Sequence, residues 1–464
     1  MATTRAEVEP ELVKGLGAMD ATTLVVGSMI GSGIFIVAAD IGRQVNSPAL
    51  LLMTWVATAV LTLIAAISYG ELAAMMPHAG GQYVYLRESF GPLAGFLYGW
   101  TLFLVIQTGT IAAVAVAFAK FLGVFVPAIS AKNYLLGSGR IGLTTQQLIA
   151  ILVIAVLTAI NARGIRTGAV VQNVFTFAKT AALLGLVLLG LFVGRNAQAL
   201  AANFTDFWQN SHWDFHTVRL VGVAMVGALF SADAWNNVTF TGAEVRNPKR
   251  NLPLALGLGV AIVMTLYIAT NFVYLNVLPL ASIQNAPEDR VATAAAAAML
   301  GPVAVQLMAA AIMVSTFGCA NGLILAGARV YFAMARDSLF FRRAGHLNAR
   351  HAPVFALVIQ GIWTMLLTLS GSYNELLDYV IFAVLLFYVL TIAGIFKLRR
   401  TRPDAPRPYR ALGYPVLPAA YIAAAGLIEI LLLLYKPKYT WPGLIIVLLG
   451  VPVYFVWHKK EVQA

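Results

Sequence analysis

The chain has 464 residues, of which 60% are hydrophobic and 11% are charged, and its formal net charge is +12. Soluble domains carry about 25% charged residues, so this composition excludes an ordinary soluble domain and predicts that most of the chain lies in lipid. The Lys and Arg residues stand in short segments between apolar runs, which argues against a nucleic-acid partner.

Long apolar runs occur throughout the sequence. In hydrocarbon every backbone polar group must be satisfied internally, and the alternation typical of a β-barrel strand is missing from these runs, so they predict helices. We therefore expect an all-α membrane protein with twelve transmembrane helices. Their approximate bounds are 16–45, 49–76, 92–124, 145–161, 169–193, 217–243, 253–278, 293–333, 353–370, 374–398, 411–435 and 440–458.

The basic residues between these segments are unevenly distributed. With a cytoplasmic N-terminus, twenty-one Lys and Arg residues fall on the cytoplasmic side and nine on the other. This bias predicts that both termini are cytoplasmic in a multi-pass protein of the cell (inner) membrane, with residues 1–15 as a cytoplasmic tail.

Two segments contain residues that disfavour a continuous helix. The first has three glycines within residues 27–33, and each costs roughly 1 kcal/mol of helix stability relative to Ala. The sixth has a polar cluster from Phe230 to Asn237 that includes Asp233, at a depth where an ionised side chain is costly. We therefore predict that helices 1 and 6 are both broken.

Breaks in the first helices of two five-helix halves indicate an inverted repeat with a binding site at the bilayer midplane. The transport core would cover residues 16–398, as helices 1–5 (16–193) and helices 6–10 (217–398). Residues 399–464 would add two further helices and the cytoplasmic C-terminus.

An unwound helix exposes backbone groups that can bind a ligand. Amides around Gly31, Ser32 and Gly33 would favour a carboxylate, and carbonyls near Met29 and Phe230 would accept hydrogen bonds from an ammonium group. The two breaks thus predict a site for a zwitterion. The alternative interpretation is that the glycines only allow close helix packing.

Three stretches resemble the amino acid-polyamine-organocation superfamily: GSGIF at 31–35, ELAAMMPHAGGQYVYLRESFGP at 71–92 and EVRNPKRNLP at 244–253. The resemblance covers nearly the whole chain and implies a LeuT-like fold. The FSADAWNNVTF stretch at 230–240 is similar to the L-type amino acid transporter branch.

The resemblance implies roles for the residues at both breaks. The substrate carboxylate would meet Ser32 and the Gly33 amide, and the ammonium would meet carbonyls near Met29, Phe230 and Asp233. Phe230 would be an aromatic gate, although a packing role is the simpler interpretation. The full set of substrate-binding residues that we expect is Met29, Ile30, Gly31, Ser32, Gly33, Gln107, Phe230, Ser231 and Asp233.

Lys179 lies in the middle of the fifth segment, where an ammonium group without partners is costly. It could serve transport, or it could simply hold helices together. The resemblance places it where sodium-coupled relatives bind their ion. It therefore implies sodium-independent transport, with the ammonium bridging helix 1 near Gly27 and helix 8 near Ser315.

Other polar residues have two open interpretations. The polar face of the eighth segment would line the cavity or bond across helices, and it comprises Ser315, Thr316, Gly318, Cys319 and Asn321. Tyr388, like Gln107, could contact the substrate. Glu71 and Glu244 could bind protons, but we favour salt-bridge or capping roles for both, and His78 is expected in a solvated loop.

The sequence has neither a phosphate-binding GxxxxGK[ST] motif nor a metal-binding HExxH motif, so we expect no enzyme activity and no cofactor. The predicted function is sodium-independent exchange of L-amino acids, above all neutral ones. Proton-coupled symport, transport of cationic amino acids and a non-transporting amino-acid sensor remain as alternatives. Residues 125–144 contain no cysteine, and by the resemblance this implies no disulfide-linked heavy chain. The oligomeric state stays open.

Overall fold

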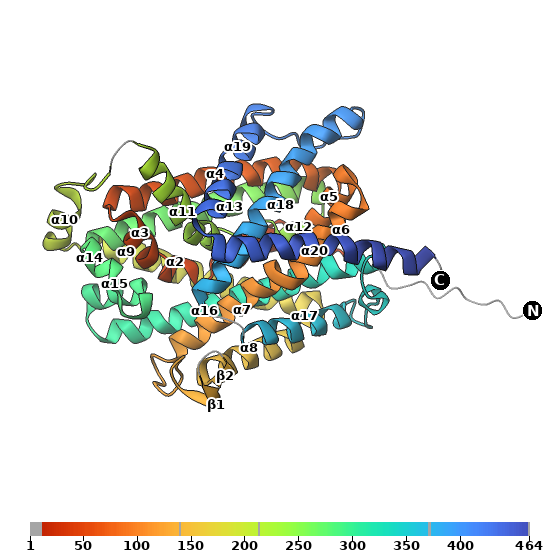
Figure 1. Ribbon diagram of the computed structural model, residues 1–464. Coiled ribbons are helices and arrows are strands. Elements are labelled where there is room, and N and C mark those ends of the chain that lie inside the picture. The colour runs from red at the N-terminus through yellow and green to blue at the C-terminus, as the bar shows by residue number, and fades with distance from the viewer. Residues whose placement is uncertain (1–11, 139–140, 212–213, 370–372, 463–464) are drawn as a thin grey trace, which may run out of the picture.

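The computed structural model describes residues 12–138, 141–211, 214–369 and 373–462. Most of its helices run along one long axis, with the short helices α10 and α14 at one end of the bundle and α5 at the other (Figure 1). In the first half of the chain the helices are α1 Ala18–Met29, α2 Gly33–Ile36, α3 Ala38–Val45, α4 Pro48–Met75, α5 Gln82–Phe90, α6 Pro92–Thr101, the π-helical turn η1 Leu102–Ile106, α7 Gln107–Leu122, α8 Thr145–Asn161, α9 Ile165–Phe192 and α10 Ala197–Phe204.

The second half continues the bundle. Its helices are α11 Phe215–Ser231, α12 Asn237–Phe240, α13 Pro248–Val277, α14 Leu280–Gln284, α15 Val291–Leu300, α16 Val303–Arg336, α17 Val354–Leu367, α18 Tyr373–Thr401, α19 Val416–Tyr435 and α20 Pro437–Val462, with 3-10 turns η2 Gly242–Glu244, η3 Pro287–Asp289 and η4 Arg342–Gly345.

Each predicted apolar segment coincides with a helix. In the described residues nine helices are long and apolar enough to cross a membrane, and shorter apolar helices accompany them. The shorter helices α8, α11 and α17 lie at the remaining three predicted segments. The protein is therefore largely helical and built to span a membrane several times.

Three details of the prediction were wrong. The expected all-α fold contains a small antiparallel hairpin, β1 Tyr134–Ser138 with β2 Ile141–Thr144, because this loop leaves the bundle and pairs with itself. The expected helix 293–333 is two helices, since Gly301 turns the chain with a φ of +78° between α15 and α16. The loop expected after the second segment contains α5, which is too short to span a bilayer.

The broken helices occupy the centre of the bundle. α1 packs against α9, α13 and α16, while α11 packs against α3, α4, α18 and α19. The backbone from Val25 to Ala39 is buried throughout, so the α1 break is enclosed by protein on every side.

Two buried carboxylates join elements distant in sequence. Glu71 on α4 accepts hydrogen bonds from Arg399 at 3.0 and 2.6 Å, and Arg407 is also paired with it. Glu244 pairs with Arg329 on α16 at 2.9 Å, and Arg329 is only 1% exposed. Both carboxylates form ion pairs in the structure, as the salt-bridge interpretation expects.

Candidate functional site

The first helix is interrupted where the glycines are. α1 ends at Met29, Ile30 has a non-helical ψ of 87°, and α2 begins at Gly33. The backbone here leaves little room for side chains: a Cβ on Gly31 would lie 3.0 Å from Cys319 Sγ on α16. Glycine thus permits both the unwinding and the close approach of α16.

The second interruption lies in the polar cluster of the sixth segment. α11 ends at Ser231, and helical structure resumes at Asn237 with α12. Between them Ala234 has a φ of +65°, in the left-handed region that non-glycine residues seldom adopt. The backbone between α11 and α12 is therefore a short non-helical turn, and it is fully buried.

The two interruptions touch each other. A Cβ on Gly33 would overlap the side chain of Ser231, so α2 can approach α11 this closely only with glycine there. The Tyr267 hydroxyl on α13 lies 2.9 Å from the Met29 carbonyl oxygen and 3.2 Å from that of Ser231, and can donate to either. The sequence analysis missed Tyr267. Its hydroxyl in an apolar segment was the available signal, because a buried tyrosine needs a partner.

Lys179 on α9 is 1% exposed, and its ammonium points at the first interruption. Nζ donates to the carbonyl oxygens of Gly27, Ile30 at 2.8 Å and Ser315 at 3.4 Å. The Ser315 hydroxyl donates to the Ile30 carbonyl oxygen at 3.1 Å. One ammonium thus joins α9, α1 and α16 through three carbonyl oxygens. Among the described residues no cluster of three or more His, Cys, Asp or Glu could hold a metal ion.

The polar face of α16 contacts three neighbouring helices, α1, α8 and α9. Cys319 Sγ donates to the Ser28 carbonyl oxygen at 3.0 Å, so it contacts α1 near the break. Asn321 accepts from Asn161 at 2.9 Å and donates to the Gln172 side chain at 3.3 Å, joining α8 and α9. These contacts bond across helices, which is one of the two interpretations that the sequence left open.

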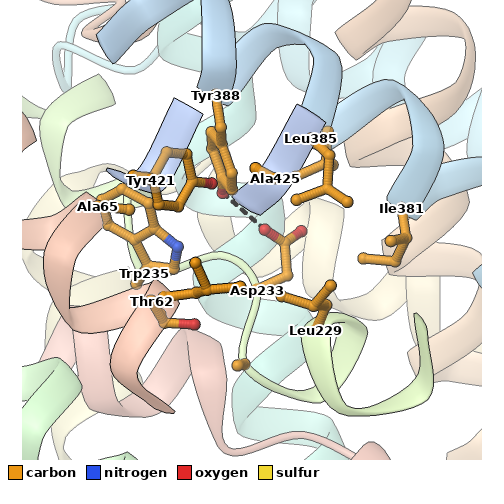
Figure 2. A pocket seen from close by; sticks show the side chains of 13 residues that line it. Thr62, Ala65, Leu229, Asp233, Trp235, Ile381, Leu385, Tyr388, Tyr421 and Ala425 are labelled. Carbon is orange, nitrogen blue, oxygen red and sulfur yellow. Dashed lines mark hydrogen bonds between the residues drawn. The ribbon is translucent and has the colours of Figure 1, made fainter. Parts of the chain in front are cut away.

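Two small cavities adjoin the second interruption. One, of about 20 Å³, is shown in Figure 2, with the Asp233 carboxylate facing Tyr388 among apolar side chains. Its lining comprises Leu61, Thr62, Ala65, Leu229, Ala232, Asp233, Trp235, Ile381, Val384, Leu385, Tyr388, Tyr421 and Ala425. The other, of about 10 Å³, shares Asp233, Val384 and Tyr388 with the first.

A hydrogen-bond chain runs along the second cavity. The Tyr388 hydroxyl lies 2.6 Å from Asp233 Oδ1 and 3.2 Å from Asn236 Oδ1. Asn236 Nδ2 donates to Gln82 Oε1 at 2.7 Å, and Gln82 Nε2 donates to the Thr391 hydroxyl at 3.1 Å. Tyr388 was predicted as a contact residue from the sequence, whereas Gln82 and Asn236 were not, because their partners come from distant segments.

The predicted site residues fall into two groups. Gln107 and Asp233 line the second cavity, and Gln107 Nε2 donates to the Leu323 carbonyl oxygen at 2.7 Å. Residues 29–33, Phe230 and Ser231 are buried and line neither of these two cavities. A cavity of about 20 Å³ holds roughly one water molecule, far less than an amino acid needs. The structure therefore describes a closed conformation.

The chain is similar in sequence to several known proteins. The family model described as amino acid permease matches residues 16–455. The chain is 30% identical over 472 residues to the large neutral amino acids transporter small subunit 2 of Mus musculus, covering 97% of this chain and 82% of that protein. It is 30% identical over 466 residues to the b(0,+)-type amino acid transporter 1 of Rattus norvegicus, covering 97% and 90%. It is also 30% identical over 454 residues to the serine/threonine exchanger SteT of Bacillus subtilis, covering 97% and 98%.

Proposed function

This chain belongs to the amino acid permease family, a family of transporters and not of enzymes, and we propose that it exchanges neutral L-amino acids across the cell membrane without sodium. Relatives named as a large neutral amino acid transporter and as a serine/threonine exchanger support this substrate class and this mode of transport. Membership of the family also implies the LeuT-like fold with its 5+5 inverted repeat.

The observation that carries the proposal is the contact between the two helix interruptions. The first amides of α2 lack the partners that a continuous helix would supply, and α2 runs on through Val37 into α3 with helical dihedrals. A substrate carboxylate would bind the Gly33 amide and Ser32, and its ammonium would bind the carbonyls at the ends of α1 and α11.

Transport would require the closed site to open toward each side in turn. We propose that α1 to α4 and α11 to α13 move as a bundle against the remaining core helices, with Phe230 as the gate at the end of α11. Separation of Gly33 from Ser231 would make room for the substrate. Lys179 would replace the coupling sodium ion, because its ammonium already binds the carbonyls of α1 and α16.

The test is exchange by the full chain in proteoliposomes. Liposomes preloaded with unlabelled L-leucine should take up labelled L-leucine several-fold faster than empty ones, and replacing sodium by choline should change nothing. Ser32→Leu should abolish binding, because its side chain would fill the carboxylate site. If none of the twenty amino acids, preloaded inside the liposomes, stimulates the uptake of labelled amino acid, the exchange proposal is wrong.

A second candidate, transport of cationic amino acids, rests on Asp233. This carboxylate lines both cavities, and in the described part of the chain no Lys or Arg forms an ion pair with it. In a competition panel against labelled L-leucine, inhibition by L-lysine and L-arginine that is lost in Asp233→Asn would favour this candidate. Inhibition by neutral amino acids alone would favour the first.

Proteoliposomes also distinguish the two remaining alternatives, a proton-coupled symporter and an amino-acid sensor. A proton-coupled symporter would be driven by an imposed pH gradient alone, and a sensor would bind amino acids without any flux. We expect no disulfide-linked partner subunit, because the only cysteine of the chain, Cys319, is buried within α16.

A further inference from the structure

A further acidic residue is buried in the membrane-spanning region, on α19, a helix outside the ten-helix core. Glu429 lies in the middle of α19 and is only 8% exposed. Its Oε1 atom is buried and has no hydrogen-bond partner. Neither the site described above nor any family motif in the sequence accounts for this carboxyl group.

Helical spacing places Glu429 in line with the cavity of Figure 2. Tyr421, Ala425 and Glu429 follow one another at intervals of four residues, so they form one stripe along α19. The first two line the cavity together with Asp233 and Tyr388. Glu429 is one helical turn, about 6 Å, beyond Ala425 on this stripe.

The cavity lies between the two parts that the proposed function moves. Leu61, Thr62 and Ala65 of α4 and Leu229 of α11 line one side, which belongs to the moving bundle. α18 and α19 form the other side, and α19 packs against both α4 and α11. Movement of the bundle would therefore alter the surroundings of this face of α19.

Among the described residues, Glu429 takes part in none of the ion pairs. Its carboxyl group therefore has no basic side chain to balance a negative charge. The charged groups on the packed helices lie toward the helix ends: Glu71 pairs with Arg399, and Arg219 lies over the ring of Tyr435. The titratable groups nearer the cavity are Tyr69 on α4, Asp233 at the α11 interruption, Tyr388 on α18 and Tyr421 on α19, and α20 contributes Tyr454, which packs against Phe96 away from the cavity lining. All of these are neutral or acidic, so an ionised Glu429 would be costly in this conformation.

We propose that Glu429 is a proton-binding site linked to the transport cycle. It holds a proton in the closed conformation and releases it to water when movement of α4 and α11 lets water reach α19. This inference rests on the proposed alternating movement. Because ionisation disfavours closure, exchange slows as the pH rises, and a side chain that is always neutral removes this dependence.

The first experiment compares the pH dependence of exchange in proteoliposomes. We expect wild-type exchange of labelled L-leucine to fall at least about threefold from mildly acidic to alkaline pH, and Glu429→Gln to abolish the fall. Glu288→Gln, at an exposed acid in η3, is the matched control and should behave like the wild type. Glu429→Leu, a second neutral side chain, should behave like Glu429→Gln.

The second experiment does not depend on transport. Infrared spectra of the reconstituted protein at neutral pH should show a protonated carboxyl band that Glu429→Gln removes and Glu288→Gln retains. If Glu429→Gln keeps the wild-type pH profile, or if only Asp233→Asn removes the pH dependence, the proposal is overturned. A band unaffected by Glu429→Gln overturns it as well. If the wild type shows no exchange at all, the proposed function fails, and the infrared comparison still decides whether Glu429 holds a proton.

Discussion

Two side chains at the first helix interruption bind the carbonyl groups that an unbroken helix would have satisfied itself. Lys179 binds the carbonyls of Gly27 and Ile30, and Tyr267 lies within hydrogen-bond distance of those of Met29 and Ser231. A buried carbonyl without a donor costs about 1–3 kcal/mol, so each side chain stabilises the interrupted backbone in this conformation. When the site opens, these bonds must be kept or exchanged for bonds to the substrate.

Tyr267→Phe should weaken exchange while leaving the fold intact, because it removes one hydroxyl and keeps the ring. Loss of a hydrogen bond of this kind costs about 0.5–1.5 kcal/mol, so we expect KM to rise by roughly two- to tenfold. Tyr274→Phe is the matched control: it lies two turns further along α13, and its hydroxyl donates to the Ile34 carbonyl oxygen beyond the interruption. Equal effects of the two substitutions in a kinetic assay would contradict a special role for Tyr267.

Lys179→Ala should lower exchange at least about tenfold, since three carbonyl oxygens lose their common donor in a buried place. Expression and the overall fold should be largely retained, while stability in detergent should fall because these carbonyls lose their donor. Lys132→Ala, at an exposed lysine before β1, serves as the control for charge removal. Unchanged uptake by Lys179→Ala would exclude the coupling role and leave the lysine as a purely structural contact.

At the level of elements, the central feature is that α2 lies directly against the end of α11. The contact is between Gly33 and Ser231, and it leaves no room for a methyl group. Glycines differ in this respect: a Cβ on Gly259 in α13 would lie 2.6 Å from Val25 on α1, whereas a Cβ on Gly257 in the same helix would meet nothing within 4 Å. The contact of α2 with α11 therefore depends on where Gly33 lies and not on glycine in general.

Gly33→Ala should disrupt the closed conformation, because its methyl group would overlap Ser231. We expect substrate exchange to be nearly lost and thermal stability to fall by about 1–3 kcal/mol, the usual cost of overpacking. Gly257→Ala should be neutral or slightly stabilising, as alanine favours helix by about 1 kcal/mol over glycine. Thermal unfolding and exchange of both variants check this. Wild-type exchange by Gly33→Ala would mean that the two half-helices do not have to meet.

For the whole molecule, the orientation in the membrane depends on which end of the bundle faces the cytoplasm. One end carries the buried ion pair of Glu244 with Arg329 and, nearby, residues 15–16, whose amides both donate to the Glu244 carbonyl oxygen. The β1–β2 hairpin lies apart from α5 and this end in Figure 1. We propose that the end with residues 15–16 faces the cytoplasm, which follows from the bias of the basic residues.

Single cysteines in a Cys319→Ala background test this orientation. Lys132→Cys, next to the hairpin, should react with a membrane-impermeant maleimide in intact cells, and Arg343→Cys, in η4, should react only after the membrane is opened. Both native side chains are exposed, so reactivity reports the side of the membrane and not burial. The reverse labelling pattern would place both termini outside.

The amino-acid sequence by itself determined the helical membrane-spanning class, the places of the apolar helices and the two interruptions. These follow from local properties: the length of apolar runs, the helix cost of glycine and the cost of polar residues in lipid. The motifs also indicated the amino acid permease family, which the comparisons showed. The hairpin and the division at Gly301 were missed, because short loops and single glycines give weak local signals.

Only the tertiary structure decided which residues meet. The sequence could show that Tyr267 and Glu429 are polar groups within apolar segments, but it could not show their neighbours, or those of Gln82, because these come from segments far away in the sequence. It also separated residues 29–33 from the small cavities beside Asp233, because the contact of Gly33 with Ser231 closes the space between them. Polar groups in lipid need partners, and the sequence shows which groups need them, but only packing determines which partners they find.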